Sequence, residues 1–188
     1  MKLKTTLLGK TYIFRDVKDV LAKANEEKTG DKLAGLAAET AQERIAAKVV
    51  LSALTLRDLR ENPAVSYEED EVTRIIQDDV NEATYRQIQN WTVAEFRQWL
   101  LDDNTTGADI RRISRGLTSE MVAAVCKLMG NLDLIYCASK ITVTAHCNTT
   151  IGLPGTLSCR LQPNHTTDDP DGITASTLEG LTSVPVTR

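Results

Sequence analysis

Residues 148–164, with the sequence NTTIGLPGTLSCRLQPN, carry the pattern on which the predicted fold of this chain depends most. Pro154 and Gly155 on one side, and Pro163 on the other, bracket the seven residues 156–162. Proline and glycine at both ends of a short run with apolar members predict a strand between two turns. Because side chains alternate along a strand, its two faces differ in polarity. The polar face holds Ser158, Arg160 and Gln162, and the apolar face holds Leu157, Cys159 and Leu161.

The polar face collects its longest side chains at the carboxyl end of this strand. In an α/β barrel that end carries the chemistry, so Arg160 and Gln162 would project hydrogen-bond donors into a pocket above the barrel. An amphipathic edge strand with Arg160 in solvent fits the same alternation, and periodicity alone leaves both interpretations open.

Length and composition place the chain among soluble globular proteins. Its 188 residues suffice for one domain, or for one domain and part of another. Charged residues make up 26% and hydrophobic residues 41%, and the formal net charge is -4. The acidic balance and the lack of a basic stripe argue against nucleic acid as a partner. The apolar runs are too short for a membrane span, and the first eight residues are too weakly apolar for a signal peptide, so we expect a cytoplasmic protein.

Cysteine and histidine do not predict a metal centre. The cysteines lie ten to twelve residues apart without a Cys-x-x-Cys pair, which favours reduced, mostly buried thiols. They are Cys126, Cys137, Cys147 and Cys159. A site built from His146, Cys147, Cys159 and His165 is the less favoured alternative, since tetrahedral sites usually have closely paired ligands.

The remaining pattern divides the chain into three parts. Residues 1–15 alternate around Gly9 and predict a hairpin, residues 16–140 predict a helical region, and residues 141–188 predict one βα unit. The predicted fold class is therefore α/β, with helices first and a strand followed by a helix at the end. A helix entry at Asp168 to Asp171, with Pro170 in the first turn, supports the last element.

Within the helical region, apolar spacing predicts individual helices and their buried sides. Gly30 ends one helix, and a longer one spans 31–53 with Leu33, Leu36 and Ile45 among its buried residues. Ser66 with Glu69 and Thr92 with Glu95 match the capping-box pattern. After the first box, we expect Val72, Ile75, Ile76 and Val80 to face inward.

Three further groups admit functional interpretations. The polar run 77–82 could suggest a metal or acid/base site, but charge runs on helices usually form solvated faces or subunit contacts. Arg111, Arg112 and Arg115 favour a surface or interface patch over a phosphate site. Trp91 and Trp99 are predicted to be packing anchors.

Many separate segments of the chain are similar, in register, to the large subunit of ethanolamine ammonia-lyase. The focal stretch resembles that family at 148–156 and 160–164, and the similarity extends from Met1 to about Leu181. Other matching segments are 1–7, 16–18, 21–25, 42–44, 76–82, 116–120 and 132–136.

This resemblance implies a helical region followed by the start of a (β/α)8 barrel, incomplete in this chain. It implies an adenosylcobalamin-dependent radical enzyme that converts ethanolamine to acetaldehyde and ammonia. It also implies a small-subunit partner, a trimer of dimers of the paired subunits, and a place in the cytoplasm or in a bacterial microcompartment. The cofactor would supply the radical chemistry, and the protein would supply orientation and electrostatics.

Carried over by residue, the family's substrate contacts fall on Arg160, Leu161 and Gln162. Arg160 would donate to the substrate hydroxyl and stabilise negative charge that develops there. Gln162 would bind the end that bears the amine. The resemblance places the cofactor contacts, and the carboxylates that balance Arg160 against an ammonium group, on strands beyond Leu181, so no cofactor or metal ligand is assigned here.

The tail 182–188 no longer resembles the family, and we expect a truncated large subunit that is inactive alone. A non-catalytic helical module for assembly or docking, derived from that subunit, is the alternative.

Overall fold

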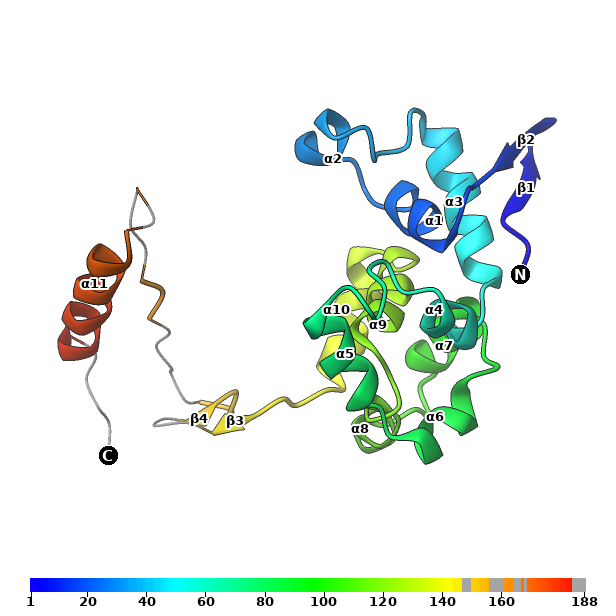
Figure 1. The fold of residues 1–188 in the computed structure, drawn as a ribbon. Coiled ribbons are helices and arrows are strands. Elements are labelled where there is room, and N and C mark those ends of the chain that lie inside the picture. Colours follow the sequence, from blue (N-terminus) through cyan, green and yellow to red (C-terminus); the bar gives the residue numbers. More distant parts are fainter. Residues whose placement is uncertain (147–149, 156–160, 164–166, 168, 184–188) are drawn as a thin grey trace. The chain divides into compact units, whose positions relative to one another are not determined.

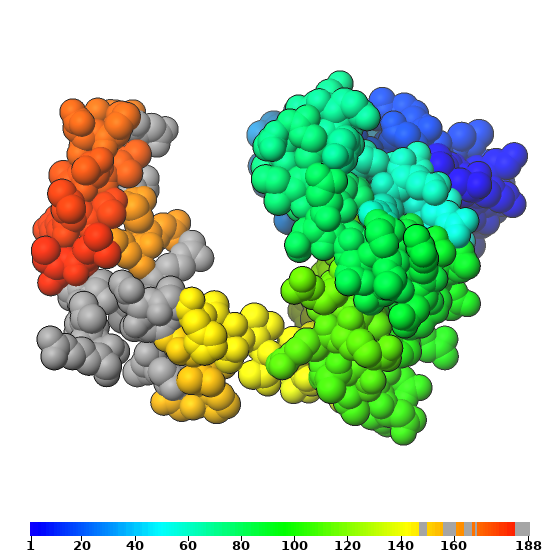
Figure 2. All heavy atoms as spheres, turned by 60° about the horizontal axis from the view of Figure 1, so that its bottom comes forward, coloured from blue at the N-terminus to red at the C-terminus, as the bar shows by residue number. Residues whose placement is uncertain are grey.

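The computed structural model describes residues 1–146, 150–155, 161–163, 167 and 169–183 (Figure 1). The chain forms two units, Met1–Ile141 and Thr142–Arg188. The first unit contains a two-stranded sheet and ten helices, and its side chains make one continuous body, coloured blue to yellow-green in Figure 2. No helix in the described ranges is long and apolar enough to cross a lipid bilayer.

The chain begins with the predicted hairpin. Strands β1 (Lys4–Leu7) and β2 (Lys10–Ile13) pair antiparallel, with Lys4 opposite Ile13. Leu8 and Gly9 both have positive φ angles, 51° and 80°, as a two-residue turn between twisted strands requires. The hairpin places Tyr12 against the helices, and the residue after β2, Phe14, is also buried.

The helices of the first unit are short, and most begin at a side-chain cap. In chain order they are α1 (Val17–Lys23), α2 (Thr29–Leu33), α3 (Ala41–Ala53), α4 (Leu56–Glu61), α5 (Glu71–Asp78), α6 (Glu82–Ile88), α7 (Val93–Leu101), α8 (Gly107–Ser114), α9 (Ser119–Lys127) and α10 (Asn131–Ser139). The hydroxyl oxygens of Thr55, Thr92 and Thr106 each accept from the backbone N–H three residues on, and the carboxylate of that third residue accepts from the backbone N–H of the threonine. The capping box predicted at Thr92 and Glu95 is confirmed.

The core lies where α1, α3, α4, α7 and α9 meet. Its fully buried side chains include Leu51, Leu56, Phe96 and Met121. Trp91 and Trp99 pack against this core with ring centroids 5.5 Å apart, so their predicted role as packing anchors is confirmed. An antiparallel bridge between Thr55 and Thr92 ties the start of α4 to the start of α7.

The single helix predicted over 31–53 is wrong, because the chain makes two helices there. Gly30 lies inside α2 rather than ending α1, and Gly35 after α2 has a φ of 67°, a left-handed conformation that ends a helix. Thr40 then caps α3. None of the residues of α2 is buried, and Leu33 is 85% exposed, so the α2 segment stands away from the core (Figure 1).

The predicted orientation of α5 is also wrong in its main point. Val72 and Ile75 are both 61% exposed, Ile76 is partly buried, and Val80, after the helix, is buried. The cap is not Ser66 but Asp70, whose carboxylate accepts from the backbone N–H of Thr73 at 2.7 Å. The apolar stripe exists as predicted, but its larger part faces solvent.

The last helix of the first unit is fastened at its end by Lys140. The ammonium group donates to the carbonyl oxygens of Leu100 (3.0 Å) and Asp102 (2.6 Å), at the carboxyl end of α7. The backbone carbonyl of Lys140 lies so close to Gly107 that a Cβ there would overlap it. Glycine is therefore required at the first residue of α8.

The second unit contains a small hairpin and one helix in its described part. Strands β3 (Ala145–His146) and β4 (Thr150–Ile151) pair antiparallel, and α11 spans Pro170–Ser183. Asp169 accepts from the backbone N–H of Gly172 at 2.9 Å, in line with the predicted helix entry. The described residues are thus mostly helical with two small hairpins, and they contain no barrel.

Candidate functional site

The predicted substrate segment is described only in part. Residues 156–160, and with them Arg160, lie outside the described residues. Leu161 is partly buried, Gln162 is exposed, and neither is in a strand. A Cβ on Gly180 would overlap the Leu161 side chain, so this segment packs closely against α11. The shared face of Arg160 and Gln162, and the substrate roles of Arg160, Leu161 and Gln162, stay predictions.

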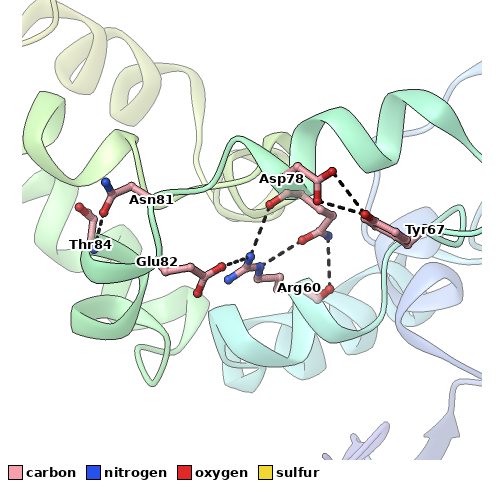
Figure 3. A network of polar contacts seen from close by, with 7 residues as sticks. Arg60, Tyr67, Asp78, Asn81, Glu82 and Thr84 are labelled. Carbon is pink, nitrogen blue, oxygen red and sulfur yellow. Dashed lines mark hydrogen bonds and ion pairs between the residues drawn. The ribbon is translucent and has the colours of Figure 1, made fainter.

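The most extensive polar arrangement in the first unit is centred on Arg60, near the end of α4 (Figure 3). Its guanidinium donates from Nε to Gln77 Oε1 at 3.1 Å and from Nη2 to Glu82 Oε1 at 2.5 Å. Gln77 returns a bond from Nε2 to the Arg60 carbonyl oxygen at 3.4 Å. The guanidinium carbon also lies 4.3 Å from the centre of the Tyr85 ring. With a side chain only 17% exposed, Arg60 joins α4, α5 and α6.

The charges in this arrangement support each other. The hydrogen bond from Arg60 lowers the pKa of Glu82, and the same bond raises the pKa of Arg60. Burial raises the pKa of the Tyr85 phenol, and the adjacent guanidinium opposes that shift. Arg60 and Glu82 therefore stay charged, and Tyr85 stays neutral, across the physiological pH range.

A hollow of about 510 Å³ opens beside this arrangement. It is lined by charged, phenolic and small side chains from the end of α4, the following loop, α5 and α6: Arg60, Glu61, Pro63, Ser66, Tyr67, Glu68, Gln77 and Tyr85. The Tyr67 hydroxyl donates to Asp78 Oδ1 at 3.1 Å, and this bond raises the pKa of Tyr67. The volume suits a small ligand or one side chain of a partner.

The polar run 77–82 is mostly used to hold the fold together. Gln77 and Glu82 bind Arg60, Asp78 accepts from Tyr67, and Asn81 caps α6 by accepting from Thr84 N–H at 2.9 Å. In the part of the chain that the structure describes, no three His, Cys, Asp or Glu side chains come together as a metal site. The prediction for this run is a solvated face or subunit contacts, and four of its six side chains also make hydrogen bonds within the first unit.

Sequence reasoning missed Arg60 and the hollow. Arg60 lies 17 residues before Gln77, and no sequence motif links the two residues. A signal was present in hindsight, because α4 is a short helix with an arginine near its end, and an arginine there can reach a carboxylate on the next helices.

The cysteine and arginine predictions are tested in part. Cys137 is buried, and burial raises the pKa of its thiol, whereas Cys126 is exposed, contrary to the expectation of mostly buried thiols. Cys147 and Cys159 lie outside the described residues. Arg111, Arg112 and Arg115 are exposed on and after α8, which is in line with a surface patch.

The chain thus forms a helical unit with a hollow between consecutive helices, followed in sequence by a small hairpin and a helix. The family model described as ethanolamine ammonia lyase large subunit matches residues 12–184. The chain therefore belongs to the ethanolamine ammonia-lyase large-subunit family.

Two relatives, from Salmonella typhimurium LT2 and Escherichia coli K12, are each described as an ethanolamine ammonia-lyase large subunit. Each is 59% identical to this chain over 181 residues. The match covers 96% of this chain and 40% of each relative. The chain thus spans about two fifths of the length of the relatives that it matches.

Proposed function

We propose that this chain is the N-terminal part of an ethanolamine ammonia-lyase large subunit, which belongs to a carbon–nitrogen lyase. The observation that carries the proposal is 59% identity over 96% of the chain to relatives described as that subunit. The reaction is the radical rearrangement of ethanolamine to acetaldehyde and ammonia. The proposed partners are the small subunit and further copies of the large subunit, in a trimer of dimers of the pairs. The proposed location is the cytoplasm, free or within a bacterial microcompartment.

In this proposal Arg160, Leu161 and Gln162 line one side of the substrate site in a barrel that later sequence completes. Arg160 donates to the hydroxyl oxygen of ethanolamine and is the electrostatic stabiliser of the migrating group. Gln162 accepts from the ammonium end through its carbonyl oxygen. A guanidinium repels a nearby ammonium unless carboxylates balance it, so the site needs acidic residues that this segment does not supply.

The family's cofactor, adenosylcobalamin, supplies a carbon-centred radical when bound. The hollow beside Arg60 does not fit it, because that hollow is lined by charged and phenolic side chains, whereas a corrin ring needs a broad, largely apolar bed. No residue of this chain is assigned to the cofactor, and we expect the chain alone to be inactive.

The proposed function is tested by a chimera in which this chain replaces the matching part of the Salmonella typhimurium relative. The chimera is assayed for acetaldehyde and ammonia with the small subunit and adenosylcobalamin. We expect activity, and we expect Arg160→Ala to lower kcat/KM by about 100-fold or more, as for loss of a charge-stabilising donor. Gln162→Ala should cost about tenfold, in line with loss of one hydrogen bond to a charged group.

Arg112→Ala is the matched control, since the Arg112 side chain is 63% exposed and its ion pair with Asp109 is long, at 3.8 Å. A folded, cofactor-loaded chimera without activity would contradict the family function for this chain. Equal effects of Arg160→Ala and Arg112→Ala would contradict the proposed role of Arg160 but not the family function. Ammonia release by the isolated 188-residue chain would contradict its expected inactivity.

The second candidate is a non-catalytic helical assembly module. It is favoured by a first unit with its own buried core and with exposed apolar side chains on several helices. Light scattering on the purified chain, with and without the small subunit and adenosylcobalamin, tests the module. A defined complex without cobalamin is the result that the module requires, absence of any defined complex would contradict the module, and a complex that retains cobalamin would show that the chain holds more of the enzyme's cofactor site than is assigned here.

A further inference from the structure

Helix α5 is attached to the first unit in an unusual way. Its partly buried side consists of Thr73, Arg74, Ile76 and Gln77, and none of its residues is fully buried. Polar side chains hold it in place, through the paired bonds of Gln77 with Arg60 and the bond from Tyr67 to Asp78. Such bonds are directional, so they fix which side of the helix faces outward.

The side that faces outward combines aliphatic and acidic residues. We call it the α5 outer face, and its members are all exposed: Glu71, Val72, Ile75, Asp78 and Asp79. Exposing two aliphatic side chains side by side on an amphipathic helix costs solvation free energy, which contact with a partner would recover. The carboxylates of Glu71, Asp78 and Asp79 beside the stripe select for a partner that carries positive charge beside its own apolar residues.

The surroundings strengthen this charge preference. Residues 61–82 hold eight carboxylate side chains and one cation, Arg74, an excess of negative charge larger than the net -4 of the whole chain. Arg60, just before this segment, pairs with Glu82, and Arg74 pairs with Glu71, which leaves six carboxylates of the segment without a cation in an ion pair in the described part of the chain. The charge that remains toward solvent is therefore strongly negative.

The hollow beside Arg60 adjoins the α5 outer face. Tyr67 lines the hollow and donates to Asp78 of the outer face, so the two features form one continuous surface. Two exposed carboxylates, Glu61 and Glu68, line the hollow together with the rings of Tyr67 and Tyr85. A long cationic side chain fits such a site, because its stem can pack on a ring while its charge meets a carboxylate.

We propose that the α5 outer face and the adjoining hollow form a docking surface for a basic amphipathic helix of a partner protein. The apolar stripe of that helix covers Val72 and Ile75, and one of its lysine or arginine side chains enters the hollow between Glu61 and Glu68. This is binding of an amphipathic helix to a groove, with a cationic anchor. The proposal does not depend on lyase activity.

The test uses the full chain and a labelled 15-residue helical peptide with leucine at the a and d positions and arginine at e and g. A peptide with glutamate in place of arginine is the charge control. Fluorescence anisotropy should show binding of the arginine peptide alone. The double variant V72S/I75S should weaken it about tenfold or more, and so should E61Q/E68Q, as loss of central anchors does.

Matched controls come from another exposed apolar face and another carboxylate. L132S/I135S on α10 and Glu39→Gln should leave binding within about twofold, because their side chains are exposed elsewhere. Equal weakening by the controls, or equal binding of the glutamate peptide, would overturn the proposal. Light scattering that shows copies of the chain assembling, and separating on V72S/I75S, would make a second copy the occupant and would also overturn it.

Discussion

Helices α9 and α5 have similar lengths and side-chain caps, yet opposite relations to the core. Thr118 caps α9, and Met121, Ala124 and Val125 of that helix are buried. Asp70 caps α5, and none of its residues is buried. Apolar contact therefore holds α9, whereas hydrogen bonds from Arg60 and Tyr67 hold α5.

The difference shows that an apolar stripe does not by itself tell which side of a helix faces the core. Burial of aliphatic surface stabilises α9 by a term that grows with area. Helix α5 buries little aliphatic surface, so it gains little of this stabilisation, and the side chains of its apolar stripe stay exposed to solvent. Helices of these two kinds should respond differently to substitution, and the following predictions test that difference.

The largest effect on stability is expected from shortening a buried side chain of α9. Met121→Ala should lower the free energy of unfolding by about 3 kcal/mol, because the side chain is fully buried and its loss leaves a cavity. Ile75→Ala on α5 should change it by less than about 0.5 kcal/mol. Urea unfolding followed by the fluorescence of Trp91 and Trp99 measures both. Similar losses for the two variants would remove the distinction between the helices.

A smaller effect is expected from removing the attachment of α5. Arg60→Met should cost about 1–3 kcal/mol, since it leaves Gln77 and Glu82 without their partner. Hydrogen exchange should show the loss of protection in α5 before that in α9. The control Arg112→Met, at a mostly exposed arginine, should stay within about 0.5 kcal/mol. Unchanged protection of α5 in Arg60→Met would show that its apolar contacts suffice.

The pH dependence of α5 should come from its cap. Hydrogen bonds from the Thr73 hydroxyl and then from its backbone N–H lower the pKa of Asp70. The folded pKa is the lower one, so this stabilisation is present above the ordinary value of about 3.9 and is lost as the pH falls through the lowered pKa. Hydrogen exchange of α5 against pH should show that loss. Asp70→Asn keeps a capping side chain and should abolish the pH dependence, whereas a surviving dependence would point to another carboxylate.

The smallest effect is expected at the bond between Tyr67 and Asp78. That bond raises the pKa of the Tyr67 phenol above its usual value near 10. Asp78→Asn should bring the phenol back toward about 10, measured by the ultraviolet absorbance of the phenolate. Asp79→Asn is the neighbouring control and should leave the titration in place. Tyr67→Phe should leave the urea midpoint of unfolding nearly unchanged, because the bond is exposed.

Local signals predicted the hairpin, the helix starts at Thr92 and near Pro170, and the tryptophan packing, because each depends on residues close in sequence. The prediction of one helix over 31–53 is wrong at Gly35. The left-handed backbone of this glycine ends a helix there, although apolar residues continue at helical spacing. The inward face of α5 failed for a different reason. The contacts that orient it join Arg60 to Gln77 and to Glu82, and spacing along one helix carries no information on them.

The two candidate sites differ in how they could be found. Family resemblance pointed to Arg160, Leu161 and Gln162, which local pattern alone could not separate from an ordinary edge strand. The hollow beside Arg60 needed the structure, since its lining comes from α4, α5, α6 and a loop. The family match covers residues 12–184, so it includes both the segment 160–162 and the hollow beside Arg60. Arg160 lies outside the described residues, whereas the residues around the hollow are described with their contacts.

The fastening at Lys140 has a mechanical consequence. A tensile load applied to the chain after Ile141 would act first on Lys140. The carbonyl oxygen of Lys140 lies against Gly107, and its ammonium group is bonded to the last turn of α7. The two hydrogen bonds of the ammonium group would share such a load between α10 and α7, so the helix end just before the unit boundary at Ile141 is anchored to a second helix.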